Sequence, residues 1–162
     1  SVTGVQTCAL PISITARTGN GAGFFVLKTN QKTNMIKIFN DTKRYQEKVN
    51  FVDSNNVLIG YDMDQSCCED ADWFIYDSIT EKILKRDETP DGTPSEMSGW
   101  NFDPDFFREI QSPDVDEGGM VAFRLVNGDA EKFLHIYNSH NGYYGHGFTV
   151  SIDGEQVKDG IL

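Results

Sequence analysis

The chain has 162 residues, of which 24% are charged and 12% aromatic, with a net charge of −11 and a pI of about 4.5. This composition is typical of a globular protein with one core and excludes an intrinsically disordered chain. The acidic charge repels phosphate backbones and argues against nucleic-acid binding. No apolar run approaches the ~20 residues of a membrane-spanning helix, so we expect no membrane partner.

The first twelve residues differ in character from the rest. Val2–Ile12 reads Val-Thr-Gly-Val-Gln-Thr-Cys-Ala-Leu-Pro-Ile, which is similar, without a mismatch, to the conceptual translation of a common short-read sequencing adapter. It does not resemble a secretory signal, because its apolar stretch is short and follows no Lys or Arg. We therefore expect residues 1–12 to be a non-native segment from a metagenomic read, and residues 13–162 to form a single globular domain.

Short apolar or alternating runs predict strands along most of that domain. We expect strands at 24–27, 34–39, 57–61, 73–76, 120–126, 132–138, 148–152 and 155–158, with hairpin turns at 127–129 and 153–154. The charged stretch 41–48 suits a loop or a short helical turn.

Two segments predict short helices. In Ser78–Arg86, three apolar residues share one helical face behind a serine that suits the N-cap. In Asp103–Ile110, the aspartate suits the N-cap and Pro104 the first helical position. The sequence therefore predicts an α+β, β-rich domain, with antiparallel sheets of about eight or nine short strands and two short helices.

The first segment with unusual chemistry is Cys67-Cys68-Glu69. Adjacent cysteines rarely pair with each other, and no disulfide framework is present, which favours a reducing, cytoplasmic setting. Neighbouring side chains on a strand point to opposite faces, so we expect one of the two cysteines to fill the core. The surrounding carboxylates raise the pKa of a thiol and oppose nucleophilic activation.

The second such segment is 138–148, which holds two of the three histidines, three glycines and two tyrosines. Tyrosine rings suit stacking on a ligand ring, and asparagine amides offer both donors and acceptors. A tight turn whose aromatics cap the core accounts for the same residues equally well. His135, within the preceding strand, is expected to be a hydrogen-bonded structural residue.

At these two segments the chain resembles a family of uncharacterised bacterial and phage proteins, a domain of unknown function. The matching residues are Gly60-Tyr61, Cys67-Cys68-Glu69 and His140–Phe148, and the resemblance runs from Val57 to Leu162. It implies one shared fold and one shared site, and it carries no established activity or cofactor.

We expect the two segments to meet and to form a polar ligand pocket. Its predicted residues are Cys67, Cys68, Glu69, Asn138, His140, Asn141, Tyr143, Tyr144 and His146. The sequence favours a non-catalytic binding module for a small, polar, ring-bearing, nucleotide-like ligand. A phage-type anti-defence protein that sequesters immune signalling nucleotides is a concrete version, and its phosphate contacts would come from Arg44, Arg86, Arg108 or Arg124.

Two alternatives stay open. One is a metal-assisted hydrolase that uses His140, His146 and nearby acids. The other is an acidic domain that binds a basic protein partner.

Overall fold

The computed structural model describes residues 33–43, 46–65, 67–142 and 144–162, which belong to one compact unit, Gln31–Leu162. Their elements are β1 (Met35–Lys43), β2 (Gln46–Asp53), β3 (Val57–Asp62), β4 (Glu69–Tyr76), the 3-10 turn η1 (Arg86–Glu88), β5 (Glu96–Ser98), β6 (Asn101–Ile110), β7 (Glu117–Asn127), β8 (Ala130–His140), β9 (Gly147–Ile152) and β10 (Glu155–Ile161). Within this part of the chain, no helix has the length and apolar character needed to cross a membrane.

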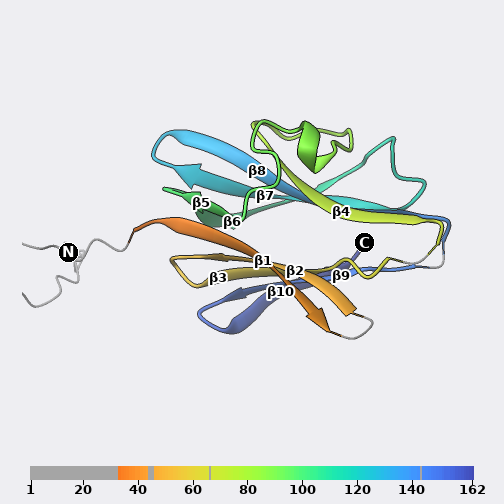
Figure 1. Ribbon diagram of the computed structural model, residues 1–162, viewed down its shortest axis with the longest axis horizontal. Helices are drawn as coiled ribbons and strands as arrows, with labels where there is room; N and C mark the ends of the chain where they lie inside the picture. Colours follow the sequence, from red (N-terminus) through yellow and green to blue (C-terminus); the bar gives the residue numbers. More distant parts are fainter. Residues whose placement is uncertain (1–32, 44–45, 66, 143) are drawn as a thin grey trace, which may run out of the picture. The chain divides into compact units, whose positions relative to one another are not determined.

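The strands form two antiparallel sheets that face each other as the layers of a sandwich (Figure 1). The six-stranded sheet has the order β10-β9-β3-β2-β1-β5, and the four-stranded sheet has the order β4-β8-β7-β6. The predicted β-rich fold is confirmed. The described residues contain ten strands, more than the eight or nine expected, and neither predicted helix forms. The predicted strand 24–27 lies outside the described residues.

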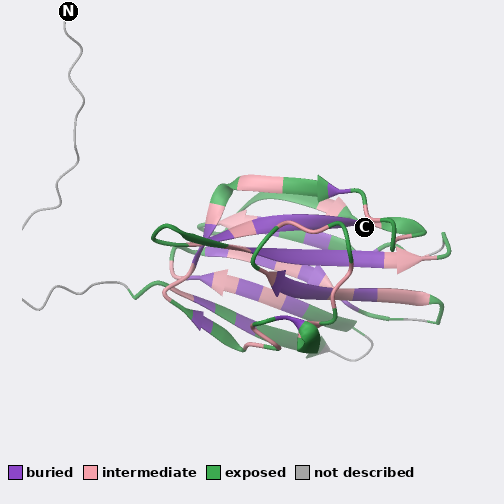
Figure 2. Ribbon diagram, turned by 90° about the horizontal axis from the view of Figure 1, so that it is seen from above, coloured by how far each residue is buried: buried purple, intermediate pink, exposed green. Residues whose placement is uncertain are grey.

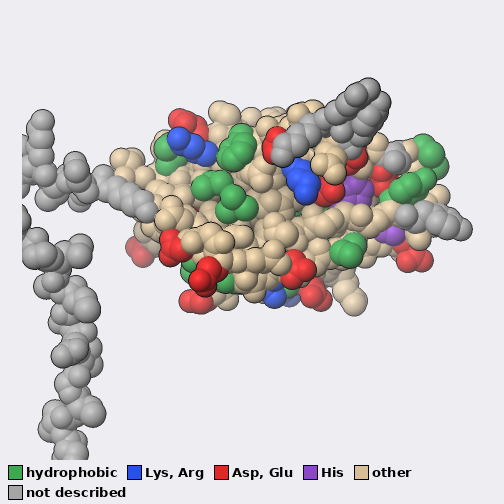
Figure 3. Space-filling view, turned by 90° about the horizontal axis from the view of Figure 1, so that it is seen from below, with side chains coloured by type: hydrophobic (Ala, Val, Ile, Leu, Met, Phe, Trp, Pro, Cys, Tyr) green, Lys and Arg blue, Asp and Glu red, His purple; other side chains and the backbone are tan. Residues whose placement is uncertain are grey.

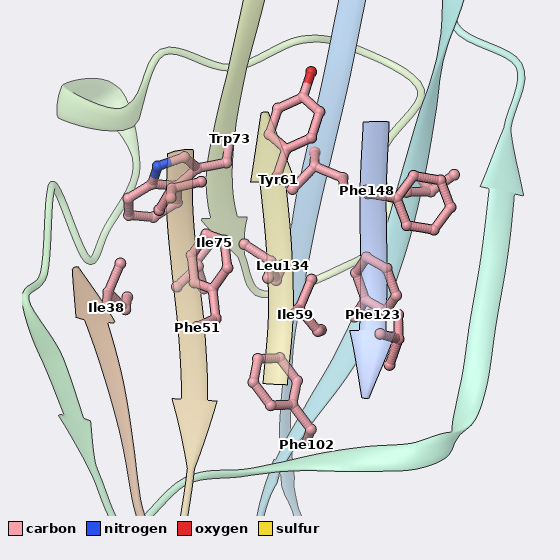
Figure 4. Close-up of a cluster of buried hydrophobic side chains, with 14 of the residues drawn as sticks. Ile38, Phe51, Ile59, Tyr61, Trp73, Ile75, Phe102, Phe123, Leu134 and Phe148 are labelled. Carbon is pink, nitrogen blue, oxygen red and sulfur yellow. The ribbon is translucent and has the colours of Figure 1, made fainter. Parts of the chain in front are cut away.

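The core lies between the sheets, because each strand turns alternate side chains inward. In β3 every second residue from Val57 to Tyr61 is buried, and Figure 2 shows similar banding along other strands. Figure 4 shows Phe51 and Ile59 of one sheet pointing toward Trp73 and Leu134 of the other. The Phe51 and Trp73 rings meet edge to face with their centroids 5.1 Å apart, a favoured geometry for an aromatic pair.

Two buried polar side chains tie the sheets together. The Asp53 carboxylate accepts two backbone N–H groups of the β2–β3 turn, at 2.8 and 2.9 Å, and the N–H of Phe102 in β6 at 3.0 Å. The Tyr61 hydroxyl crosses the core and donates to the carbonyl of Tyr137 at 2.6 Å. Burial raises the pKa of the Tyr61 hydroxyl, so it stays a donor at all ordinary pH values.

The helix predicted at 103–110 is wrong, because this segment is the outer strand β6 paired with β7. The Asp103 carboxylate does accept an N–H two residues on, from Asp105 at 3.0 Å, as a cap would. That bond closes a turn within a break in the β6–β7 pairing between Phe102 and Phe107. Pro104 lies in this unpaired stretch, where its missing N–H removes no ladder hydrogen bond.

The helix predicted at 78–86 is also wrong. This segment is a loop with bends, and η1 begins only at Arg86. The apolar residues that suggested a helical face, Ile79, Ile83 and Leu84, pack instead on the outer face of the four-stranded sheet around Phe74. Figure 1 shows this loop above that sheet. The apolar residues indicated correctly that this segment packs on the protein, but their spacing predicted the wrong local structure.

Several predicted strands are confirmed. The hairpin of β7 and β8 turns at 127–130, and β9 and β10 form the expected C-terminal hairpin. The charged stretch 41–48, expected as a loop or helical turn, belongs largely to β1 and β2, which pair across it. Its charges are compatible with a strand because the described side chains there are exposed.

Candidate functional site

The two segments singled out in the sequence lie together at one end of the sandwich. β4 begins at Glu69 and β8 ends at His140, and these two residues are paired across the strands. On the other side of His140 lies Glu117, the first residue of β7. We call this end the motif end, formed by the described residues 67–70, 116–118, 138–142 and 144–146. Figure 3 shows histidine and acidic side chains gathered there, at the right of the view.

A buried imidazole–carboxylate pair joins the two segments. His146 Nε2 lies 3.0 Å from Glu69 Oε2, and the two side chains are 5% and 1% exposed. His146 Nδ1 lies 2.8 Å from the backbone carbonyl oxygen of Asp62. A carbonyl oxygen can only accept a hydrogen bond, so His146 Nδ1 carries a proton. The contact between Nε2 and the Glu69 carboxylate needs a second proton, which the two groups share. The pair therefore fastens β3, β4 and the loop before β9.

Asn138 has a similar internal role. Its side chain is fully buried, and its Nδ2 donates to the carbonyl oxygens of Tyr144 at 2.7 Å and Leu162 at 3.0 Å. The main chain of Leu162 also exchanges two 2.9 Å hydrogen bonds with that of His146. Among the predicted ligand-binding residues, Asn138, Glu69 and His146 thus hold the loop in place from within.

His140 and Asn141 remain on the open side. His140 Nδ1 accepts the N–H of Gly142 at 2.8 Å, which places the proton of the neutral ring on Nε2. His140 and Asn141 line a hollow of about 330 Å³ with Cys68, Glu69, Asp70, Asp116 and Ser139. In the described part of the chain no protein group bonds His140 Nε2, so this N–H is available to a ligand.

Both cysteines are exposed, so the expectation that one fills the core is wrong. The reason is local: Cys68 has a φ of 72°, so the chain turns there before β4 begins. A hydrogen bond with Cys67 raises the pKa of the Cys68 thiol, which opposes its use as a nucleophile. Coulombic interaction with Cys67 raises the pKa of the Tyr144 hydroxyl. Tyr143 lies outside the described residues.

His135 is the structural residue expected from the sequence. It is fully buried and stacks on Phe74 with centroids 4.5 Å apart. Its Nδ1 lies 3.2 Å from the carbonyl oxygen of Phe133, and its Nε2 accepts the N–H of Thr80 at 3.3 Å. Burial lowers the pKa of the imidazole to about 4, so the ring is neutral at physiological pH.

The hollow includes residues that sequence reasoning missed, above all Asp116 and Ser139. Asp116 belongs to a turn that the sequence marks only as acidic. The predicted hairpin at 127–129 could have located Asp116, because antiparallel pairing places the start of the first strand of a hairpin beside the end of its second strand. The pairing of Glu117 with His140 is that arrangement.

The described residues that line the hollow include three carboxylates, Glu69, Asp70 and Asp116, and no lysine or arginine. Asp70 is paired with Lys85, whose Nζ lies 3.2 Å from Oδ2, and Arg86 is paired with Asp72 at 3.0 Å. Arg124 is seven residues along β7 from Glu117, about 23 Å at strand spacing. Of the other arginines considered for phosphate contacts, Arg108 lies on β6 and Arg44 outside the described residues.

A metal centre finds little support in this geometry. Both nitrogens of His146 are engaged in hydrogen bonds, so metal binding would have to break one of them. Over residues 33–162, apart from the few positions not described, no three His, Cys, Asp or Glu side chains are grouped to hold an ion.

Comparisons with models of protein families, with curated proteins and with solved structures found no match. The resemblance to the bacterial and phage family therefore stays a prediction.

Proposed function

We propose that the motif end is a non-catalytic binding site for a small, polar, ring-bearing molecule that is neutral or positively charged, such as a nucleoside. The observation that carries this proposal is that some motif residues are buried and structural, whereas others are open to a ligand. Glu69, Asn138 and His146 are buried and fix the loop, whereas His140 and Asn141 line an open hollow. A scaffold that holds a few polar groups in place at a concave surface is what small-ligand binding requires.

The chemistry of the lining supports recognition of hydroxyl and amine groups. The carboxylates of Asp70 and Asp116 and the amide oxygen of Asn141 accept hydrogen bonds, and Nε2–H of His140 donates one. The Asp116 carboxylate repels a phosphate, and the neighbouring Lys85 is already paired with Asp70. This favours the base and sugar of a nucleotide-like ligand and disfavours its phosphates.

Binding without catalysis accounts better for the state of the reactive groups than the metal-assisted hydrolase does. The Cys68 thiol has a raised pKa, and the ring nitrogens of His146 are occupied by Asp62 and Glu69. A basic protein partner at the same acidic surface stays an alternative, for which salt-dependent association is the expected mark.

The test is a binding titration, by calorimetry or ligand-observed NMR, with the four common ribonucleosides and their 5′-monophosphates. We expect at least one nucleoside to bind and its monophosphate to bind more weakly. His140→Phe keeps a ring but removes the Nε2–H donor, and it lowers the nucleoside affinity by about five-fold, the value of one hydrogen bond. Asp116→Asn narrows the gap between nucleoside and monophosphate, because it removes one repelling charge.

The matched control is Asp129→Asn, which removes an exposed carboxylate in the β7–β8 turn, at the other end of the same strands. It should change neither the affinity for the nucleoside nor that for its monophosphate. If no nucleoside binds, or if folded His140→Phe and Asp116→Asn bind all ligands as the unaltered protein does, the proposal is wrong.

A further inference from the structure

A second hollow, away from the motif end, lies between β6 and the β9–β10 hairpin. Its volume is about 190 Å³ and its lining is mainly apolar, with Ile59, Phe102, Phe106, Phe123, Val150 and Val157 among the contributing side chains. Phe102, Phe123 and Ile59 are labelled in Figure 4, where they border the same side of the core. The volume exceeds the roughly 150 Å³ of an apolar cavity able to hold a benzene ring.

Irregularities in both outer strands build this hollow. Between Phe102 and Phe107, β6 advances five residues while β7 advances two, from Leu125 to Phe123, so β6 carries three extra residues. Between Gln156 and Lys158, β10 advances two residues while β9 advances one, so Val157 is extra. Such bulges redirect side chains and interrupt pairing, and they are common beside binding sites.

The extra residues are the ones that border the opening. Pro104 and Phe106 of the β6 bulge and Val157 of the β10 bulge all line the hollow. Val157 is 56% exposed, so part of its side chain is in contact with solvent at the opening. Two interruptions on separate sheets that face one space indicate that the opening is a built feature of the sandwich.

The charges at the rim favour an anion. Asp103 is bound by Arg124, whose Nε donates to it at 3.0 Å, and this contact holds the pKa of the Asp103 carboxyl below its usual range. Lys158 Nζ lies 4.1 Å from the ring centroid of Phe107 and, within the described residues, has no carboxylate at ion-pair distance. The uncompensated charge at the rim is therefore positive.

We propose that this hollow binds a small amphiphilic carboxylic acid, with one aromatic ring or an alkyl chain of similar volume inside and its carboxylate paired with Lys158. The apolar walls recognise the body of the ligand by area burial, and the ammonium group selects the acid over a neutral analogue. This site is separate from the motif end and does not depend on the function proposed there.

The experiment is a titration with 3-phenylpropionate and with its neutral counterpart 3-phenylpropan-1-ol, followed by chemical-shift changes of backbone amides. We expect the acid to bind more tightly and to shift amides of β6, β9 and β10. Lys158→Gln should weaken acid binding by about five-fold, the upper value for an exposed ion pair, and leave alcohol binding unchanged. Val157→Gln, at an exposed bulge where folding is not at risk, should weaken both ligands.

Two controls separate this site from other effects. Lys48→Gln removes an exposed lysine from β2, and Asp116→Asn alters only the motif end; neither should change binding of the acid. The proposal fails if the acid does not bind, if acid and alcohol bind equally, or if Lys158→Gln binds the acid as the unaltered protein does.

Discussion

The buried pair of His146 and Glu69 offers the sharpest test of how the motif end is held. Glu69→Met replaces the carboxylate by an apolar chain of similar length and leaves His146 Nε2 buried without a partner. Both side chains are at most 5% exposed, so breaking the pair should lower the free energy of unfolding by about 3 to 5 kcal/mol. With a urea dependence of about 2 kcal/mol per M, the unfolding midpoint should fall by about 2 M.

Glu69→Gln is the matched variant, because the geometry predicts a different outcome for it. The glutamine amide can donate to Nε2 of a neutral ring whose Nδ1 proton stays on the carbonyl of Asp62, 2.8 Å away. This variant should lose about 1 kcal/mol, the net value of a hydrogen bond. Urea unfolding followed by tryptophan fluorescence gives both values, and ring-nitrogen NMR shifts report the protons on His146.

The outcome that refutes this reasoning is equally definite. If Glu69→Met unfolds within 1 kcal/mol of the unaltered protein, the pair does not fasten the motif end. If Glu69→Gln lowers the free energy of unfolding as much as Glu69→Met does, the pair depends on the negative charge of Glu69. The protons assigned to His146 from its contacts with Asp62 and Glu69 are then wrong.

Two further predictions concern stability. The pKa of His135 is about 4 in the folded protein and 6.5 for an ordinary histidine, so the unfolded chain binds a proton that the folded chain excludes, and stability falls as pH drops from about 6.5 to 4. Unfolding experiments should show that His135 accounts for about 3 kcal/mol of this loss of stability. His135→Gln should lack that contribution, whereas His140→Gln should retain it. If the unaltered protein and both variants lose stability equally over this pH range, the prediction is wrong. Asp53→Ala leaves three backbone N–H groups, two of them buried, without their acceptor and should cost roughly 3 kcal/mol by urea unfolding. A loss below about 1 kcal/mol, the net value of one hydrogen bond, would show that these bonds are replaced.

Much of the sheet architecture could be predicted because burial on one face leaves a period of two in the sequence. The strands around Ile59, Val121 and Leu134 lie where their apolar runs indicate. The helix errors arose where local signals compete with pairing. Asp103 and Pro104 are good helix starters, yet Phe107–Ile110 pair with β7 and Ile110 is buried there.

The site was harder to predict than the strands. The meeting of the two motif segments follows from β4 pairing with β8, which the sequence allows without specifying. The sequence offered no sign that His146 and Asn138 are buried while His140 is open, because all three are polar residues near the same turn. The exposure of Cys68 depends on a backbone turn at that residue, and no local composition requires it.

The contacts that complete the motif end have a consequence for how the protein folds. The bond from His146 to Glu69 closes a span of 77 residues, and that from Tyr61 to Tyr137 closes 76. Such loops are costly to close before other contacts exist, so this end should order late, after the local hairpins. In a chain still being synthesised, the edge of β3 that pairs with β9 would stay open, and Glu69 would lack its contact with His146, until β9 arrives.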